Sequence, residues 1–132
     1  MFDTNVHWLA VIVATAAAMG IGAAWYGVLA KQWAAAVGGN VEEMRGATPG
    51  YVVAAVSALV RAYVLAVFIK TLGAFNAAEG VGIAIIVWAA FVVTFAAVTY
   101  MFSKRPLKLF LIDAGHELVL YVVIGAILGG WQ

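Results

Sequence analysis

Four long apolar segments are the feature that most limits how this chain can fold. They cover residues 8–30, 51–70, 81–102 and 108–131. A helix needs roughly 20 residues to cross a hydrocarbon core of about 30 Å, and each segment reaches that length. The segments are rich in alanine and lack the two-residue alternation of strands. The sequence therefore predicts an all-α, integral membrane four-helix bundle that forms one domain over residues 1–132.

The composition agrees with a membrane protein and excludes several other classes. The chain is 67% hydrophobic and 10% charged, whereas soluble domains are about 45–50% apolar and about 25% charged. Without cysteine it can form neither disulfides nor thiolate-based sites. A net charge of +1 without blocks of like charge indicates no nucleic-acid partner. The lipid bilayer is the expected partner.

The distribution of basic residues predicts the orientation of the spans. The connection 31–50 contains Lys31 and Arg45, and the connection 103–108 contains three more basic residues. The opposite side has only Lys70. By the positive-inside rule, the two basic connections lie in the cytoplasm and both termini lie on the non-cytoplasmic side. We therefore expect a multi-pass protein of the cell inner (plasma) membrane, with a first span that is retained because no basic region precedes it.

Aromatic residues reveal a weak internal similarity between the first and third spans. The end of the first span, AAWYGVLAKQW (23–33), resembles that of the third, AVTYMFSKRPL (97–107), with Tyr26 aligned on Tyr100.

Tryptophan and tyrosine also mark the expected membrane interfaces, because their rings are enriched at headgroup level. We expect Trp8 and Trp131 at the outer interface, Trp33, Tyr51 and Tyr100 near the inner one, and Trp88 and Tyr121 as deeper packing residues.

Two charged residues lie near the centres of different spans. Arg61 and Glu117 are each about 14–15 Å along their helices from the same side of the membrane. An unpaired charge at a helix centre costs about 2.5–3.5 kcal/mol. The matched depths therefore predict that the guanidinium and the carboxylate face each other between the second and fourth spans.

Further polar residues extend this candidate site. Asp113 is one turn from Glu117 on the same helix face, and His116 lies at its edge. Trp25 and Tyr26 are expected at similar depth. Ionisable residues inside a span indicate a functional site. We expect Arg61 to act as an anion clamp or counter-ion and the other ionisable groups to accept protons in a ligand-binding site or proton relay.

Other interpretations of the same residues stay open. The Arg61–Glu117 pair could be purely structural. Metal binding by Asp113, His116 and Glu117 would need further ligands that the sequence does not place nearby. We therefore expect no metal and no cofactor. No nucleophile with an evident base is present, so the chain is not expected to be an enzyme.

Small residues indicate where helices approach closely. The first span contains Gly20 and Gly22, and the last contains Gly125 and Gly129 in a G-x-x-x-G spacing. Such residues let helix backbones come together in a membrane. Both packing within the bundle and contact between copies of the chain fit this pattern.

The two ends of the chain carry a set of motifs. An early Asn is followed by a first helix that ends in G-x-x-W-Y with a second Trp after it, and the last helix follows basic residues and Pro and closes in a G-A-I-L-G-x-W-like tail. The positions are Asn5, Gly22, Trp25, Tyr26, Trp33, Lys104, Arg105, Pro106, Gly125, Gly129 and Trp131. This set resembles the domain of unknown function (DUF) 1761 family of small four-helix bacterial membrane proteins. Members often have an aromatic residue and then His where this chain has His116 and Glu117. The resemblance implies the four-span topology and a bacterial origin, and no reaction.

The leading functional hypothesis is a ligand-binding or transport-type protein with an intramembrane polar site between the second and fourth spans. An accessory or scaffold subunit of a larger membrane complex is the alternative, and a homo-oligomer fits either class. A membrane enzyme that acts on a lipophilic substrate is a third class, for which the sequence contains no matching motif.

Overall fold

The computed structural model describes residues 1–39 and 48–131, and every regular element in this part of the chain is helical. Arg45, one of the basic residues used to predict the orientation, lies outside the described residues. The helices are α1 (Trp8–Val28), α2 (Ala30–Val37), α4 (Thr48–Thr71), α5 (Ala77–Val87), the π-helix η1 (Trp88–Val93), α6 (Thr94–Phe102) and α7 (Leu107–Gly130). Here α5, η1 and α6 form one continuous span, so four helical segments among the described residues are long and apolar enough to cross a membrane. The predicted all-α, four-span fold is confirmed.

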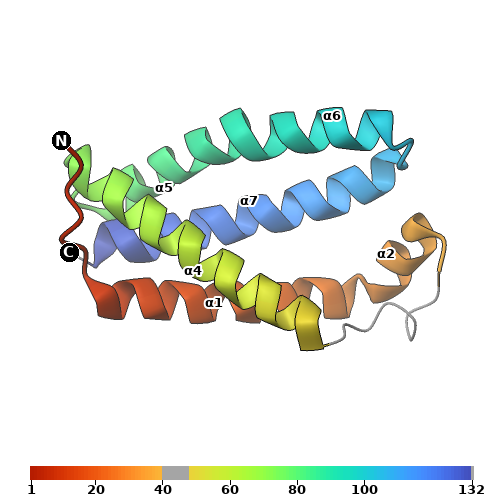
Figure 1. Cartoon of the computed structure of the whole chain (residues 1–132), viewed down its shortest axis with the longest axis horizontal. Coiled ribbons are helices and arrows are strands. Elements are labelled where there is room, and N and C mark those ends of the chain that lie inside the picture. Colours follow the sequence, from red (N-terminus) through yellow and green to blue (C-terminus); the bar gives the residue numbers. More distant parts are fainter. Residues whose placement is uncertain (40–47, 132) are drawn as a thin grey trace.

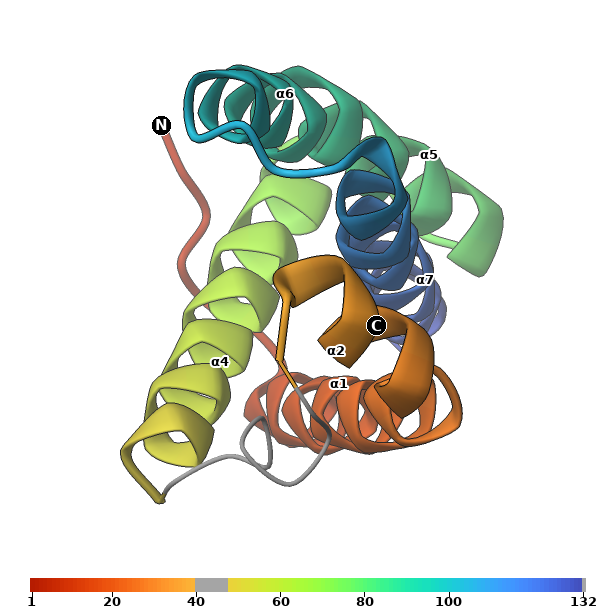
Figure 2. The same cartoon turned by 90° about the vertical axis from the view of Figure 1, so that its right-hand side faces the viewer.

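The four spans run up and down, so that both termini lie at one end of the molecule (Figure 1). We call this the terminal end; it also holds the connection between α4 and α5. The opposite end, here called the loop end, holds α2 and the connection between α6 and α7. Figure 2 shows α2 lying across the loop end, where it contacts α7.

Helix α7 is the central element of the bundle. Within the described part of the chain it contacts each of the other helices. Helix α4 crosses α1 and α7 obliquely, whereas α5 runs alongside α7 (Figure 1). This position keeps His116 buried and Asp113 and Glu117 partly buried, although other α7 side chains such as Leu111 face outward.

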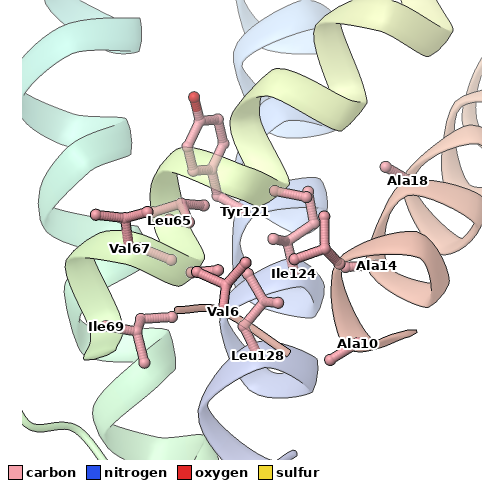
Figure 3. Packing of buried hydrophobic residues seen from close by; sticks show 14 of the residues in the cluster. Val6, Ala10, Ala14, Ala18, Leu65, Val67, Ile69, Tyr121, Ile124 and Leu128 are labelled. Carbon is pink, nitrogen blue, oxygen red and sulfur yellow. The ribbon is translucent and has the colours of Figure 1, made fainter. Parts of the chain in front are cut away.

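An apolar core fills the half of the bundle nearer the terminal end (Figure 3). Leu65 and Ile69 of α4 and Ile124 of α7 are almost completely buried. Helix α1 faces them with alanines, including Ala14 and Ala18. Small residues on α1 let its backbone approach the larger side chains of α4 and α7.

Large apolar side chains cover the outside of the bundle. On the third span they include Phe91, Phe95 and Met101, which are all exposed. Helix α4 similarly presents Val53 and Val56 outward. Outward-facing apolar residues of this size are expected where lipid, rather than water, surrounds the protein.

The first connection differs from the prediction. Residues 31–50 were expected as a connecting loop, and the first span was expected to reach residue 30. Instead α1 ends at Val28, because Leu29 leaves the helical conformation, and α2 follows immediately. Gly38 ends α2 with a φ of 94°, which glycine adopts without the steric penalty of a side chain.

The third span also begins earlier than the expected residue 81, at Ala77. Residues 77–80 were assigned to a connection, and this interpretation was wrong. The Asn76 side chain accepts a hydrogen bond from the Glu79 backbone N–H, and the Glu79 carboxylate accepts one from the Phe75 N–H. This reciprocal capping stabilises the start of the helix, and a search for apolar residues alone does not detect it.

Candidate functional site

An ion pair joins α4 and α7 in the middle of the bundle. The Arg61 guanidinium lies 2.8 Å from a Glu117 carboxylate oxygen, as their matched depths predict. The guanidinium also lies over the Tyr121 ring, 5.9 Å from its centroid, within the range of a cation–π contact. The Arg61 side chain remains 34% exposed and that of Glu117 19%. The pair is therefore accessible on the Arg61 side.

His116 lies beside this pair with its hydrogen-bonding capacity unused. Its Nδ1 is 3.5 Å from the second Glu117 oxygen, too long for a well-formed hydrogen bond. Both ring nitrogens are buried without a hydrogen-bond partner in the described part of the chain. The ring lies against Tyr26, with 4.9 Å between centroids, and Gly22 packs beside Nε2, where an added Cβ would lie 3.5 Å away. Buried polar atoms are normally paired, so the two unpaired ring nitrogens set His116 apart from the other polar residues of this cluster.

Asp113 has a different environment from that of Glu117. Its carboxylate accepts hydrogen bonds from the Tyr26 hydroxyl (2.7 Å), the Trp33 indole N–H (3.2 Å) and the Tyr100 hydroxyl (2.5 Å). These donors come from α1, α2 and α6, so one side chain of α7 holds three other elements at the loop end. This arrangement favours a structural role for Asp113, and its predicted role as a proton acceptor stays a prediction.

Two indoles bind the backbone of α7 next to these ionisable residues. Trp25 donates to the carbonyl of Ile112 (3.0 Å) and Trp88 to that of Ala114 (3.1 Å). Gly115 leaves space for the Trp25 ring, since a Cβ there would lie 3.2 Å from it. Trp88 begins the π-helix η1, a distortion often found at functional sites. Hydrogen bonds from α1 and from the third span thus hold in place the segment of α7 that carries the polar residues.

The predicted packing glycines occupy different environments. Gly125 and Gly129 of α7 lie against α5, where a Cβ on Gly80 would come within 2.1 Å of the Gly125 carbonyl oxygen. Gly22 lies against His116, and Gly20 has no neighbouring atom within 4 Å of an added Cβ. The G-x-x-x-G spacing therefore packs within this chain.

Sequence reasoning did not assign Trp33 and Tyr100 to the site. Both were interpreted as interfacial aromatic residues, yet both donate to Asp113. The alignment of Tyr26 with Tyr100 contained a usable signal, because the two hydroxyls bind the two oxygens of one carboxylate. In residues 1–39 and 48–131, no three His, Asp or Glu side chains cluster in a way that could hold a metal ion.

Replacing Asp113 with Asn is expected to loosen the loop end. An amide presents only one acceptor oxygen and turns an N–H₂ group toward one of the donors, so at least one hydroxyl or indole loses its partner. Each lost hydrogen bond to a charged group costs about 1.5–3 kcal/mol. Hydrogen exchange should rise in α2 and in the last turn of α6. Trp33→Phe, which removes a single donor, should affect α2 alone; equal exchange in the two variants would contradict this role.

The fold and the site together define a four-span helical membrane protein with a polar cluster around its central helix. A family model described as "Protein of unknown function (DUF1761)" matches residues 9–129. The chain therefore belongs to the DUF1761 family, as its end motifs predict. Comparisons with curated proteins and with solved structures gave no match.

Proposed function

We propose that this protein binds a small carboxylate anion inside the membrane and takes up a proton as it does so. Arg61 is the anion ligand, and Glu117 with His116 is the proton site. The observation that supports this most is the state of Arg61: one internal carboxylate pairs with it at 2.8 Å, and a third of its side chain is still exposed. Glu117 therefore occupies the place that the carboxylate of a ligand would take.

Competition between Glu117 and the ligand couples the two events. While Glu117 is ionised it neutralises Arg61, and a second anion at that position would be repelled. When Glu117 takes up a proton, Arg61 loses its partner, and an incoming carboxylate restores the pairing that a charge in the membrane requires. We propose that a small movement of the His116 ring closes the 3.5 Å gap between its Nδ1 and Glu117, so that the two groups exchange a proton. One anion and one proton enter together, so the net charge of the site stays constant.

The apolar core limits access to one side. Leu65 and Ile69 follow Arg61 along α4, and Ile124 follows Glu117 along α7, so these buried residues lie on the terminal-end side of the ion pair. We therefore propose that the ligand enters from the loop end. Lys31, Lys104 and Arg105 are near that end, and by the positive-inside rule we propose that it faces the cytoplasm of a bacterial cell. On this view both termini lie on the non-cytoplasmic side of the inner membrane.

Benzoate is a suitable probe, because it combines one carboxylate for Arg61 with a small apolar ring. Calorimetry in two buffers of different ionisation enthalpy should show uptake of about one proton per bound anion. Arg61→Gln should weaken binding by at least tenfold, which corresponds to about 1.4 kcal/mol. Glu117→Gln mimics the protonated carboxyl group, so it should keep or improve binding and abolish proton uptake.

Lys108→Gln is the matched control, since it removes one positive charge from an exposed position at the loop end. This variant should bind as the wild type does. Benzoate binding that is equally strong in the Arg61 and Lys108 variants would contradict the proposed site. Binding without proton uptake in the wild type would contradict the coupling alone.

An accessory subunit of a larger membrane complex is a second candidate. It is supported by the outer face of the third span, where Phe91, Phe95, Val98, Met101 and Phe102 are exposed. This span has the smallest buried share of the four, so it has the most surface left for another membrane protein. Stoichiometric co-purification of such a partner in mild detergent would favour this function.

A further inference from the structure

A separate cavity lies at the terminal end of the bundle, on the far side of the apolar core from the ion pair. Its volume is about 250 Å³. Ala10 of α1, Leu128 of α7 and Trp131 line it, and Figure 3 labels Ala10 and Leu128 in the adjoining core. The polar residues that line it include His7 and Lys70. A water molecule occupies about 30 Å³ in the liquid, so the cavity has room for a ligand of several heavy atoms.

Lys70 brings a positive charge to this cavity, and no carboxylate among residues 1–39 and 48–131 forms a salt bridge with it. Its ammonium group donates to the backbone carbonyl of Asn5. The acidic side chains at this end are engaged elsewhere: Asp3 accepts from the Asn5 N–H, and Glu79 accepts from the Phe75 N–H. In the described part of the chain neither forms a salt bridge with Lys70. An anion in the cavity would supply the missing counter-charge.

His7 adds a second donor of defined direction. Its Nδ1 accepts the Ala10 backbone N–H at 3.2 Å and thereby caps α1. In a neutral ring the hydrogen is then on Nε2, which is free to donate. The ring lies against Trp131, with 5.5 Å between centroids. The positive end of the α1 dipole is at the same place and favours an anion further.

We infer that this cavity binds a phosphate group, with the Lys70 ammonium and the His7 Nε2–H as its donors. Lysine acts as a point charge toward phosphate, and the cavity lies at the end of the spans, at the level where lipid phosphates are found. Trp8 and Trp131 are at the same end, as expected for aromatic residues at headgroup level. The apolar wall would hold the ester-linked part of the ligand. The group could come from a lipid headgroup or from a soluble phosphate.

The site can be tested on the full chain labelled with 5-fluorotryptophan in a maltoside detergent free of phosphate. The ¹⁹F resonance of Trp131, assigned with Trp131→Phe, reports on the cavity, and that of Trp33 reports on the loop end. Inorganic phosphate is titrated in one experiment and dihexanoyl phosphatidylglycerol in another. We expect saturable movement of the Trp131 resonance in at least one titration, without movement of the Trp33 resonance. The responding probe identifies the source of the phosphate group.

Variants of the two donors decide whether the cavity is responsible. Lys70→Gln should weaken binding at least tenfold, whereas Lys70→Arg should retain it and Lys108→Gln should leave it unchanged. His7→Ser keeps an N-cap acceptor but cannot reach the cavity, so it should weaken binding severalfold even if Lys70→Gln fails to fold. No saturable shift with either probe, or a shift that survives both Lys70→Gln and His7→Ser, would overturn the inference.

Discussion

Replacing Gly80 with alanine is expected to force α5 away from α7 and to destabilise the protein strongly. A Cβ at this position would lie 2.1 Å from the Gly125 carbonyl oxygen and 2.9 Å from the Gly129 Cα. Both are backbone atoms, so neither can rotate out of the way. Overpacking typically costs 1–3 kcal/mol, and we expect about 3 kcal/mol here because the two backbones themselves must separate. Unfolding in mixed micelles, followed by tryptophan fluorescence, measures the change.

Gly82 provides a matched control two residues further along the same helix. A Cβ at Gly82 meets no atom within 4 Å. Gly82→Ala should therefore be neutral or should stabilise α5 by up to about 1 kcal/mol, the difference in helix propensity between the two residues. If Gly80→Ala changed the free energy of unfolding no more than Gly82→Ala does, this result would contradict the close contact between α5 and α7.

The four spans could be predicted from the sequence because their cause is local. A helix of about 20 apolar residues is long enough to cross the membrane core, whichever helices pack against it. The meeting of Arg61 with Glu117 could also be predicted, since an unpaired charge in a span is costly and only one pair had matching depths. Both inferences depend on position along a helix, which the sequence gives directly.

The choice of partner helix could not be predicted in the same way. Gly125 and Gly129 were recognised as packing residues, but Gly80 was not recognised as their counterpart. The helices are apolar on every side, so the sequence does not show which face of α5 turns toward α7. Such a face is fixed only when all the side chains are packed together.

The hydrogen bonds of Asp113 were missed for a related reason. An aromatic residue at headgroup level satisfies the interfacial preference whether its polar atom meets water or a carboxylate. Trp33 also lies on α2, in a segment that was expected to be a loop. The sequence therefore placed Asp113 and Tyr26 in the candidate site, but it predicted neither their hydrogen bond nor the short helix that brings the Trp33 indole to α7.

Replacing Glu117 with leucine is expected to destabilise the protein, because it leaves the Arg61 guanidinium without its partner. Removing one member of a buried ion pair costs 3–5 kcal/mol in soluble proteins, whereas polar pairs in membranes contribute about 1–2 kcal/mol at most. Since the Arg61 side chain is 34% exposed, we expect a loss of about 2 kcal/mol in the free energy of unfolding.

The double variant Arg61→Leu with Glu117→Leu separates stability from function. Apolar residues that replace both members of a pair are often neutral or stabilising, so the double variant should recover most of the stability that Glu117→Leu loses. It should nevertheless fail to bind benzoate, because the anion ligand is absent. A double variant as unstable as Glu117→Leu would show that the loss comes from the missing Glu117 side chain and not from an uncompensated guanidinium. A stable double variant that still binds benzoate would support the destabilisation by an unpaired guanidinium. It would contradict the role of Arg61 as the anion ligand.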